Sequence, residues 1–235
     1  MREEHAQRNK VEDLRGKSGH VALLGDSIFD NGAYTSGGPD VVTQLRRLLP
    51  ANWGATLLAV DGAMIGDIPA HLSRLPREAS HLILSVGGND LLANLDLMSA
   101  RVNSVTQSLE KLRDRLMAFE RSYRGTMTDL LELDLPTTIC TIYNGNLSQE
   151  DAPRLGLGNA DIDVLLVGLA PFNDVILRVA FENRLDVIDL RLVCSEPEDY
   201  ANPIEPSSHG GQKIADAIVR MLALGDSKAG SRVVC

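Results

Sequence analysis

Aromatic residues, cysteines and basic residues are all scarce in this 235-residue chain. Aromatics make up 4% of the sequence, so the core has to be built mainly from Leu, Val, Ile and Ala. Asp and Glu outnumber Lys and Arg by 32 to 23, which gives a net charge of −9. A protein with this balance lacks the basic stripe that neutralises phosphates, which argues against nucleic acid or an anionic membrane as its main partner.

The cysteine pattern and the lack of long apolar runs predict the cellular compartment of the protein. Cys140, Cys194 and Cys235 are odd in number and lack metal-ligand spacing, so we expect inert reduced thiols rather than a disulfide framework. Residues 1–18 form a charged arm without an apolar signal region. No apolar run approaches the length of a membrane span. The sequence therefore predicts a cytoplasmic protein with no membrane span.

Short apolar runs alternate along the chain with longer amphipathic stretches, as in proteins of the α/β class. The predicted strands are His20–Leu24, Ala55–Val60, His81–Val86, Thr137–Tyr143 and Leu185–Leu190. The predicted helices are Pro39–Leu49, Gly66–Leu75, Ala100–Tyr123, Asp161–Asn183 (kinked or split at Pro171) and Ser207–Leu224.

The predicted strands are continuously apolar, which indicates a parallel sheet covered by helices on both faces. Residues 19–224 are therefore predicted to form one flavodoxin-like three-layer α/β/α sandwich with a five-stranded parallel sheet, followed by a flexible tail at 225–235. Ligands of such folds bind beyond the carboxyl ends of the strands. Two loops next to the fourth strand, Gly125–Leu135 and Asn144–Ala160, are read as insertions, and the second could form a substrate wall.

Two predicted strands end in small-residue turns that carry reactive side chains. Gly25-Asp26-Ser27 follows the first strand, and Gly87-Gly88-Asn89-Asp90 follows the third. A serine at the carboxyl end of a parallel strand is well placed to be a nucleophile, and an asparagine one strand away can donate to an oxyanion. Each residue has a structural alternative as a helix cap or turn former, so the pair carries the signal rather than either turn alone.

These motifs resemble those of the SGNH hydrolases, the GDSL-type esterase and lipase superfamily, over roughly residues 20–224. The resemblance implies that Ser27 is the nucleophile. It also implies that the Gly66 N–H, within Asp61-Gly62-Ala63-Met64-Ile65-Gly66-Asp67, and the Asn89 side chain contribute to the oxyanion hole. No metal or organic cofactor is implied.

The last motif departs from that pattern, in which Asp, two further residues and His precede the final helix. Aligning Gly210 and Ile214-Ala215 with the pattern places Glu205 at the histidine position and Asn202 at the aspartate position. His209, the one histidine in this segment, lies four residues later.

Three interpretations of the last motif remain open. His209 could serve as general base from the start of the last helix, one turn beyond Glu205. Glu205 could take the serine proton directly if burial raises its pKa from the ordinary value of about 4.3. In the third interpretation neither group acts, and the site is slow or inactive.

The sequence thus predicts a serine esterase that cleaves a small carboxylic ester through an acyl-serine intermediate. Pocket walls are expected from Asp30–Gly38, Leu91–Met98 and Asn144–Ala160, whose mixed polarity does not favour a long lipid chain. The alternatives are an acyltransferase that uses the same serine, or a non-catalytic module that binds a ligand or a partner.

Overall fold

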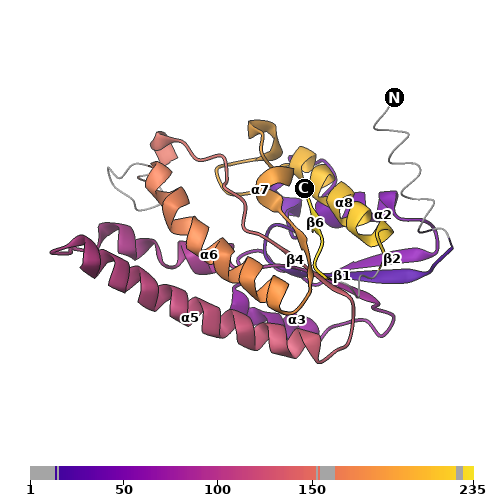
Figure 1. Cartoon of the computed structure of the whole chain (residues 1–235). Coiled ribbons are helices and arrows are strands. Elements are labelled where there is room, and N and C mark those ends of the chain that lie inside the picture. The colour runs from indigo at the N-terminus through magenta and orange to yellow at the C-terminus, as the bar shows by residue number, and fades with distance from the viewer. Residues whose placement is uncertain (1–13, 15, 152, 154–161, 226–229) are drawn as a thin grey trace.

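The computed structural model describes residues 14, 16–151, 153, 162–225 and 230–235, and it contains one parallel sheet (Figure 1). Its strands lie in the order β2-β1-β3-β4-β5-β6, and every neighbouring pair is parallel. The strands are β1 (Gly19–Gly25), β2 (Trp53–Leu57), β3 (His81–Ser85), β4 (Thr137–Cys140), β5 (Asp186–Ile188) and β6 (Val233–Val234).

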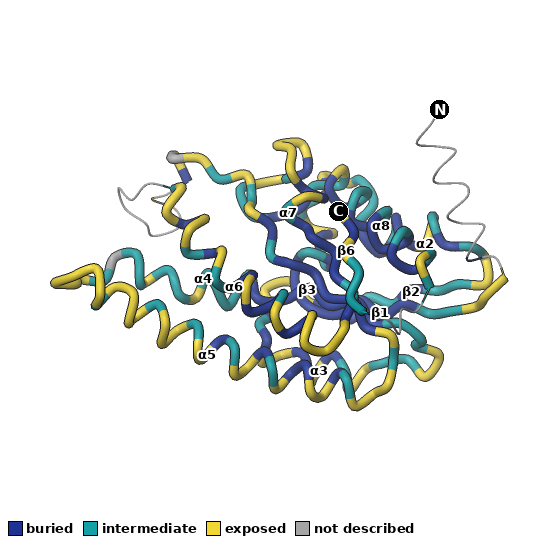
Figure 2. Tube along the Cα trace, viewed as in Figure 1, coloured by how far each residue is buried: buried dark blue, intermediate teal, exposed yellow. Residues whose placement is uncertain are grey.

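Successive side chains of β1 point to opposite faces of the sheet, so this strand contributes to the hydrophobic core on both faces. Val21 and Leu23 pack on one face of the sheet with Val41 and Leu45, whereas Ala22 and Leu24 pack on the other. The strands form the buried centre of the molecule (Figure 2). Burial on both faces explains why the strands read as continuous apolar runs.

Helices cover both faces of the sheet (Figure 1). One face carries α2 (Val41–Leu48), α7 (Leu190–Val193) and α8 (Ser208–Ala223). The other carries α3 (Ile68–Leu72), α5 (Val105–Leu131) and α6 (Ile162–Glu182). The remaining elements are short: α4 (Gly88–Leu92), η1 (Gly32–Tyr34), η2 (Ile65–Asp67), η3 (Leu95–Ser99), η4 (Gln149–Asp151) and η5 (Pro197–Asp199).

The predicted three-layer fold is confirmed, with differences in detail. A sixth strand, β6, pairs with β5 from within the segment expected to be a flexible tail, because two residues are too short to give a strand pattern. Helix α5 continues through Gly125, so the expected insertion before β4 is mostly helix. Helix α6 is not split at Pro171. Much of the predicted Asn144–Ala160 loop falls outside the described residues.

Helix α6 corrects the expectation that no segment is long and apolar enough to cross a membrane. Within its 21 residues, an 18-residue window reaches a mean hydropathy of 1.8. Phe172, Val175, Ile176 and Val179 are nevertheless buried against the sheet and α5, so α6 is a core helix of the domain.

The first halves of α5 and α6 pack differently from their second halves. In α5 every buried residue lies at or after Phe119, and the helix reaches well past the sheet (Figure 1). Because a helix that follows a parallel strand runs back along the sheet, both helices begin at the carboxyl edge of the strands. The overhanging first turns therefore flank the edge at which ligands bind.

Candidate active site

Ser27 lies in the turn directly after β1 and is 7% exposed. The turn is closed by bonds from the N–H groups of Phe29 and Asp30 to the Asp26 carbonyl. The Ser27 N–H makes no hydrogen bond within the described part of the chain, so it is available to an incoming group. Its hydroxyl lines a pocket at the carboxyl edge of the sheet.

Gly25 fixes the direction in which Ser27 leaves the strand. Its φ of 127° lies in the region that favours glycine, and an added Cβ would lie 1.7 Å from the Ser85 carbonyl oxygen. The Gly25 N–H points at Nδ1 of the buried His71, 3.4 Å away. Burial lowers the pKa of His71, which keeps this ring neutral and able to accept.

Asn89 lines the same pocket from α4, the helical turn that follows β3. Its Nδ2 donates to the Ala63 carbonyl at 3.0 Å, and the amide carries a second N–H for another acceptor. The structure therefore brings Ser27 and Asn89 together, as expected from neighbouring parallel strands.

Gly66 lies in η2, and two hydrogen bonds connect η2 and the residues just before it to α4. The Ile65 N–H donates to the Asp90 carboxylate at 3.1 Å, next to the Asn89–Ala63 bond. Gly66 itself is exposed and is not among the residues that line the Ser27 pocket. Its N–H makes no hydrogen bond to another described residue.

Glu205 enters the pocket from the loop before α8, and its side chain is directed at Ser27. The residue is 8% exposed, and its Oε2 is buried with no hydrogen-bond partner in the described structure. Burial raises the pKa of the Glu205 carboxyl to about 7, and hydrogen bonding from the Ser27 hydroxyl partly opposes this rise. The Ser27 and Glu205 side chains therefore lie next to each other in the pocket, as a nucleophile and its general base must.

The loop that carries Glu205 is held on several sides. Asn202 Oδ1 accepts from the N–H groups of Ile204 and Glu205, at 3.0 and 3.1 Å. The Tyr143 hydroxyl donates to the Ile204 carbonyl, and Asn31 Nδ2 donates to the Pro206 carbonyl. Asn202 thus stabilises the turn of the loop instead of orienting a base.

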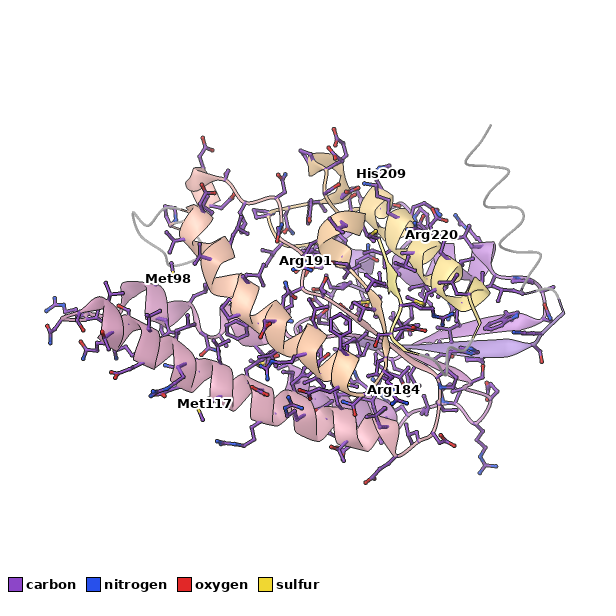
Figure 3. All side chains as sticks on the ribbon, in the orientation of Figure 1. Met98, Met117, Arg184, Arg191, His209 and Arg220 are labelled. Carbon is purple, nitrogen blue, oxygen red and sulfur yellow. The ribbon has the colours of Figure 1, made fainter. Side chains whose placement is uncertain are left out.

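His209 lies outside this pocket. It occupies the first turn of α8, with 63% of its side chain exposed, on the outer surface (Figure 3). Its Nε2 is 3.7 Å from Oδ1 of the fully buried Asp199, whose Oδ2 pairs with Lys213 at 2.7 Å. The structure brings Glu205 to Ser27 and leaves His209 beside a separate ion pair.

A second carboxyl group, Asp26, is buried in the same pocket. Its Oδ1 accepts the Ile28 N–H at 3.1 Å, and the side chain is 3% exposed. Burial raises the pKa of Asp26 to about 7, and the nearby charges of Glu205 and Asp90 add to the rise. Asp26 and Glu205 are the charged residues that line this pocket, so both ionised forms are disfavoured.

No described residues suggest metal or thiol chemistry. None of the His, Cys, Asp and Glu side chains in the described ranges gather in threes that could hold a metal ion. The three cysteines are free, and burial raises the pKa of Cys194 to about 12 and that of Cys140 still further. A thiol with so high a pKa is a poor nucleophile at neutral pH.

Comparison with known proteins identifies the fold and the family. The model of the GDSL-like lipase/acylhydrolase family matches residues 23–212, most of the chain. The protein belongs to this family. No curated protein matches the sequence significantly.

Solved structures of a lipase, a phospholipase and an acetyl xylan esterase share the fold. An extracellular lipase from Streptomyces rimosus has a TM-score of 0.58 at 16% identity, over 88% of this chain and 100% of its own. Phospholipase A1 from Streptomyces albidoflavus has a TM-score of 0.57 at 15% identity, over 88% and 100%. A single-substitution variant of an acetyl xylan esterase from Geobacillus stearothermophilus has a TM-score of 0.55 at 15% identity, over 90% and 97%.

Two supporting residues of this GDSL-like protein were missed at the level of sequence. Asp26 was read only as part of the motif, although it is a buried carboxyl beside Glu205. His71 lies outside the sequence motifs, although its ring accepts from the Gly25 N–H, 46 residues earlier in the sequence. The sequence does show one sign of a role for His71, since it is a polar residue within the apolar stretch Ile68–Leu72. For Asp26, nothing in the sequence shows that Glu205 lies nearby.

Proposed function

We propose that the protein is a serine esterase in which Ser27 is the nucleophile and Glu205 the general base. The observation that carries this proposal is the shared burial of Ser27 and Glu205, side chain to side chain, in one pocket. A Glu with a pKa of about 7 is far better matched to proton transfer at neutral pH than an ordinary one. His209 has no comparable access to Ser27.

In the first half of the proposed reaction, the Ser27 oxygen attacks the ester carbonyl carbon while Glu205 takes the hydroxyl proton. The carbonyl oxygen becomes negative and is met by the Asn89 amide and by the N–H groups of Ser27 and Gly66. Protonated Glu205 then donates to the departing alcohol, which leaves an acyl-serine. In the second half, water attacks the acyl carbon while Glu205 accepts a proton from it, and Glu205 then donates that proton to the Ser27 oxygen as the acyl–oxygen bond breaks and the acid is released.

The pocket fits a small carboxylic ester with an apolar acyl group. Apart from the reactive groups, its walls are mostly aliphatic: Ile28, Val86, Leu91, Leu92, Ile142, Leu147, Leu165, Leu166 and Leu169. A buried aliphatic pocket favours an apolar acyl group over a charged one.

Fluorophosphonate labelling and hydrolysis of p-nitrophenyl acetate test the proposal. Wild type should form a Ser27 adduct and turn over the ester, and Ser27→Ala should lose both. The rate should rise with pH through about 7, because the base acts only when Glu205 is ionised. An unlabelled Ser27 with no turnover would favour a non-catalytic module, and turnover that requires an added alcohol acceptor would favour acyl transfer.

A further inference from the structure

A second apolar cavity adjoins the Ser27 pocket at the overhanging ends of α5 and α6. It lies between η3, the first turns of α5 and the first turns of α6. Its apolar lining includes Leu95, Leu97, Met98, Val102, Leu109, Leu112, Val164, Leu165, Val167 and Phe172. Lys111 is the one charged residue among those that line it.

Two leucines line both cavities. Leu91, from α4, and Leu165, from α6, line both the Ser27 pocket and the second cavity. Leu165 is 6% exposed and packs with Leu95, Met98 and Leu147. Figure 3 places Met98 near the start of α6, beyond the sheet. The apolar lining of the Ser27 pocket thus adjoins that of the second cavity at these two leucines.

Several apolar side chains around the second cavity remain in contact with water. Leu109 is 60% exposed, Val164 48% and Val167 71%, although all three line the same cavity. Contiguous exposed apolar groups mark binding surfaces, and covering them with an alkyl chain is favourable because it removes apolar area from water. The continuity with the Ser27 pocket identifies the occupant as the far end of the group whose carbonyl carbon Ser27 attacks.

We propose that this second cavity binds the distal part of a long, unbranched acyl chain, so that Leu91 and Leu165 set the preferred acyl length. This inference rests on the proposed esterase function and extends it from small esters to medium- and long-chain acyl esters. The sequence predicted the opposite, because the mixed polarity of residues 91–98 hides which side chains face inward.

Gly168 offers a way to fill the second cavity without disturbing the fold. It lies inside α6 and lines the cavity, and an added Cβ would have nothing within 4 Å. Replacing a glycine inside a helix with leucine also favours the helix, because leucine has the higher helix propensity. Gly125 is the matched control: it lies inside α5, has equally open space, and is absent from both cavities.

The test compares p-nitrophenyl acetate with p-nitrophenyl decanoate at concentrations below micelle formation. Wild type should show a kcat/KM at least tenfold higher for decanoate. Gly168→Leu should lower the decanoate value at least tenfold and leave acetate within twofold, and Gly125→Leu should change neither. Equal wild-type values, an unaffected decanoate value in Gly168→Leu, or an equal loss in Gly125→Leu would each overturn the proposal.

Direct binding separates this inference from the proposed function. N-methyl decanamide should bind Ser27→Ala at least tenfold more tightly than N-methyl butanamide does, measured by calorimetry. Gly168→Leu in that background should remove the difference. Failure of ester turnover with this binding preserved would reject only the esterase, whereas equal binding of the two amides would reject the acyl site.

Discussion

Glu205 and His209 are four residues apart and lie in opposite surroundings. Glu205 is buried, faces Ser27 and has a raised pKa, whereas the His209 side chain is mostly exposed and faces the Asp199–Lys213 pair. By residue type alone, histidine is the better general base at neutral pH. Under the proposed function, position and burial outweigh residue type, because burial raises the pKa of a carboxyl toward that of an imidazole in water.

The largest expected effect separates the two residues by activity. Glu205→Gln keeps the size of the side chain and removes the base, so kcat/KM for p-nitrophenyl acetate should fall by about 10²–10⁴. His209→Gln should stay within twofold of wild type. Steady-state kinetics at pH 8 measures both.

The reverse pattern, with activity lost in His209→Gln and kept in Glu205→Gln, would assign the base to histidine and break the comparison. Circular dichroism spectra of both variants control for folding.

The next effect concerns the residue beside His209. Asp199 is fully buried, and its Oδ2 accepts from Lys213 and from the Glu196 N–H. Asp199→Ala leaves these donors unpaired, so the free energy of unfolding should fall by about 1–3 kcal/mol. His209→Gln should change it by less than about 0.5 kcal/mol, as is usual at exposed positions.

Urea denaturation at pH 7 measures both unfolding free energies. If Asp199→Ala and His209→Gln lowered kcat/KM to the same extent in the folded proteins, Asp199 would act in catalysis by positioning His209. Its role would then not be purely structural.

The last effect is a pH dependence of stability to which the raised pKa of Glu205 contributes. Its pKa is raised from 4.5 to about 7 in the folded state, so between these values the native protein binds more protons than the unfolded chain. The free energy of unfolding therefore falls as pH rises through this window. Glu205→Gln removes that loss and should be about 1–3 kcal/mol more stable than wild type at pH 8, with little difference at pH 4.5.

Denaturant titrations at the two pH values test this, with His209→Gln as the control that should follow wild type. A Glu205→Gln variant less stable than wild type at pH 8 would mean that the ionised carboxylate is stabilised in the fold, contrary to a raised pKa.

The strands and helices differ in how well the sequence predicted them. The first five strands lie close to their predicted ranges, since apolar runs between turns report burial directly. β6 was not predicted, because two valines become a strand only through pairing with β5. The first helical turns of α5 and α6 read as ordinary amphipathic helix, although they project beyond the sheet and leave apolar residues exposed.

The amino-acid sequence was enough to predict the parallel α/β fold and the proximity of Ser27 and Asn89, because strand patterns and the turns that follow them are local and parallel strands end at a common edge. The folded chain was needed to show that Glu205, and not His209, lies with Ser27 and that Asp26 lies near Glu205. The physical reason is that burial depends on contacts between segments distant in sequence, such as the Asn31–Pro206 bond, and burial sets both the pKa and the direction of a side chain.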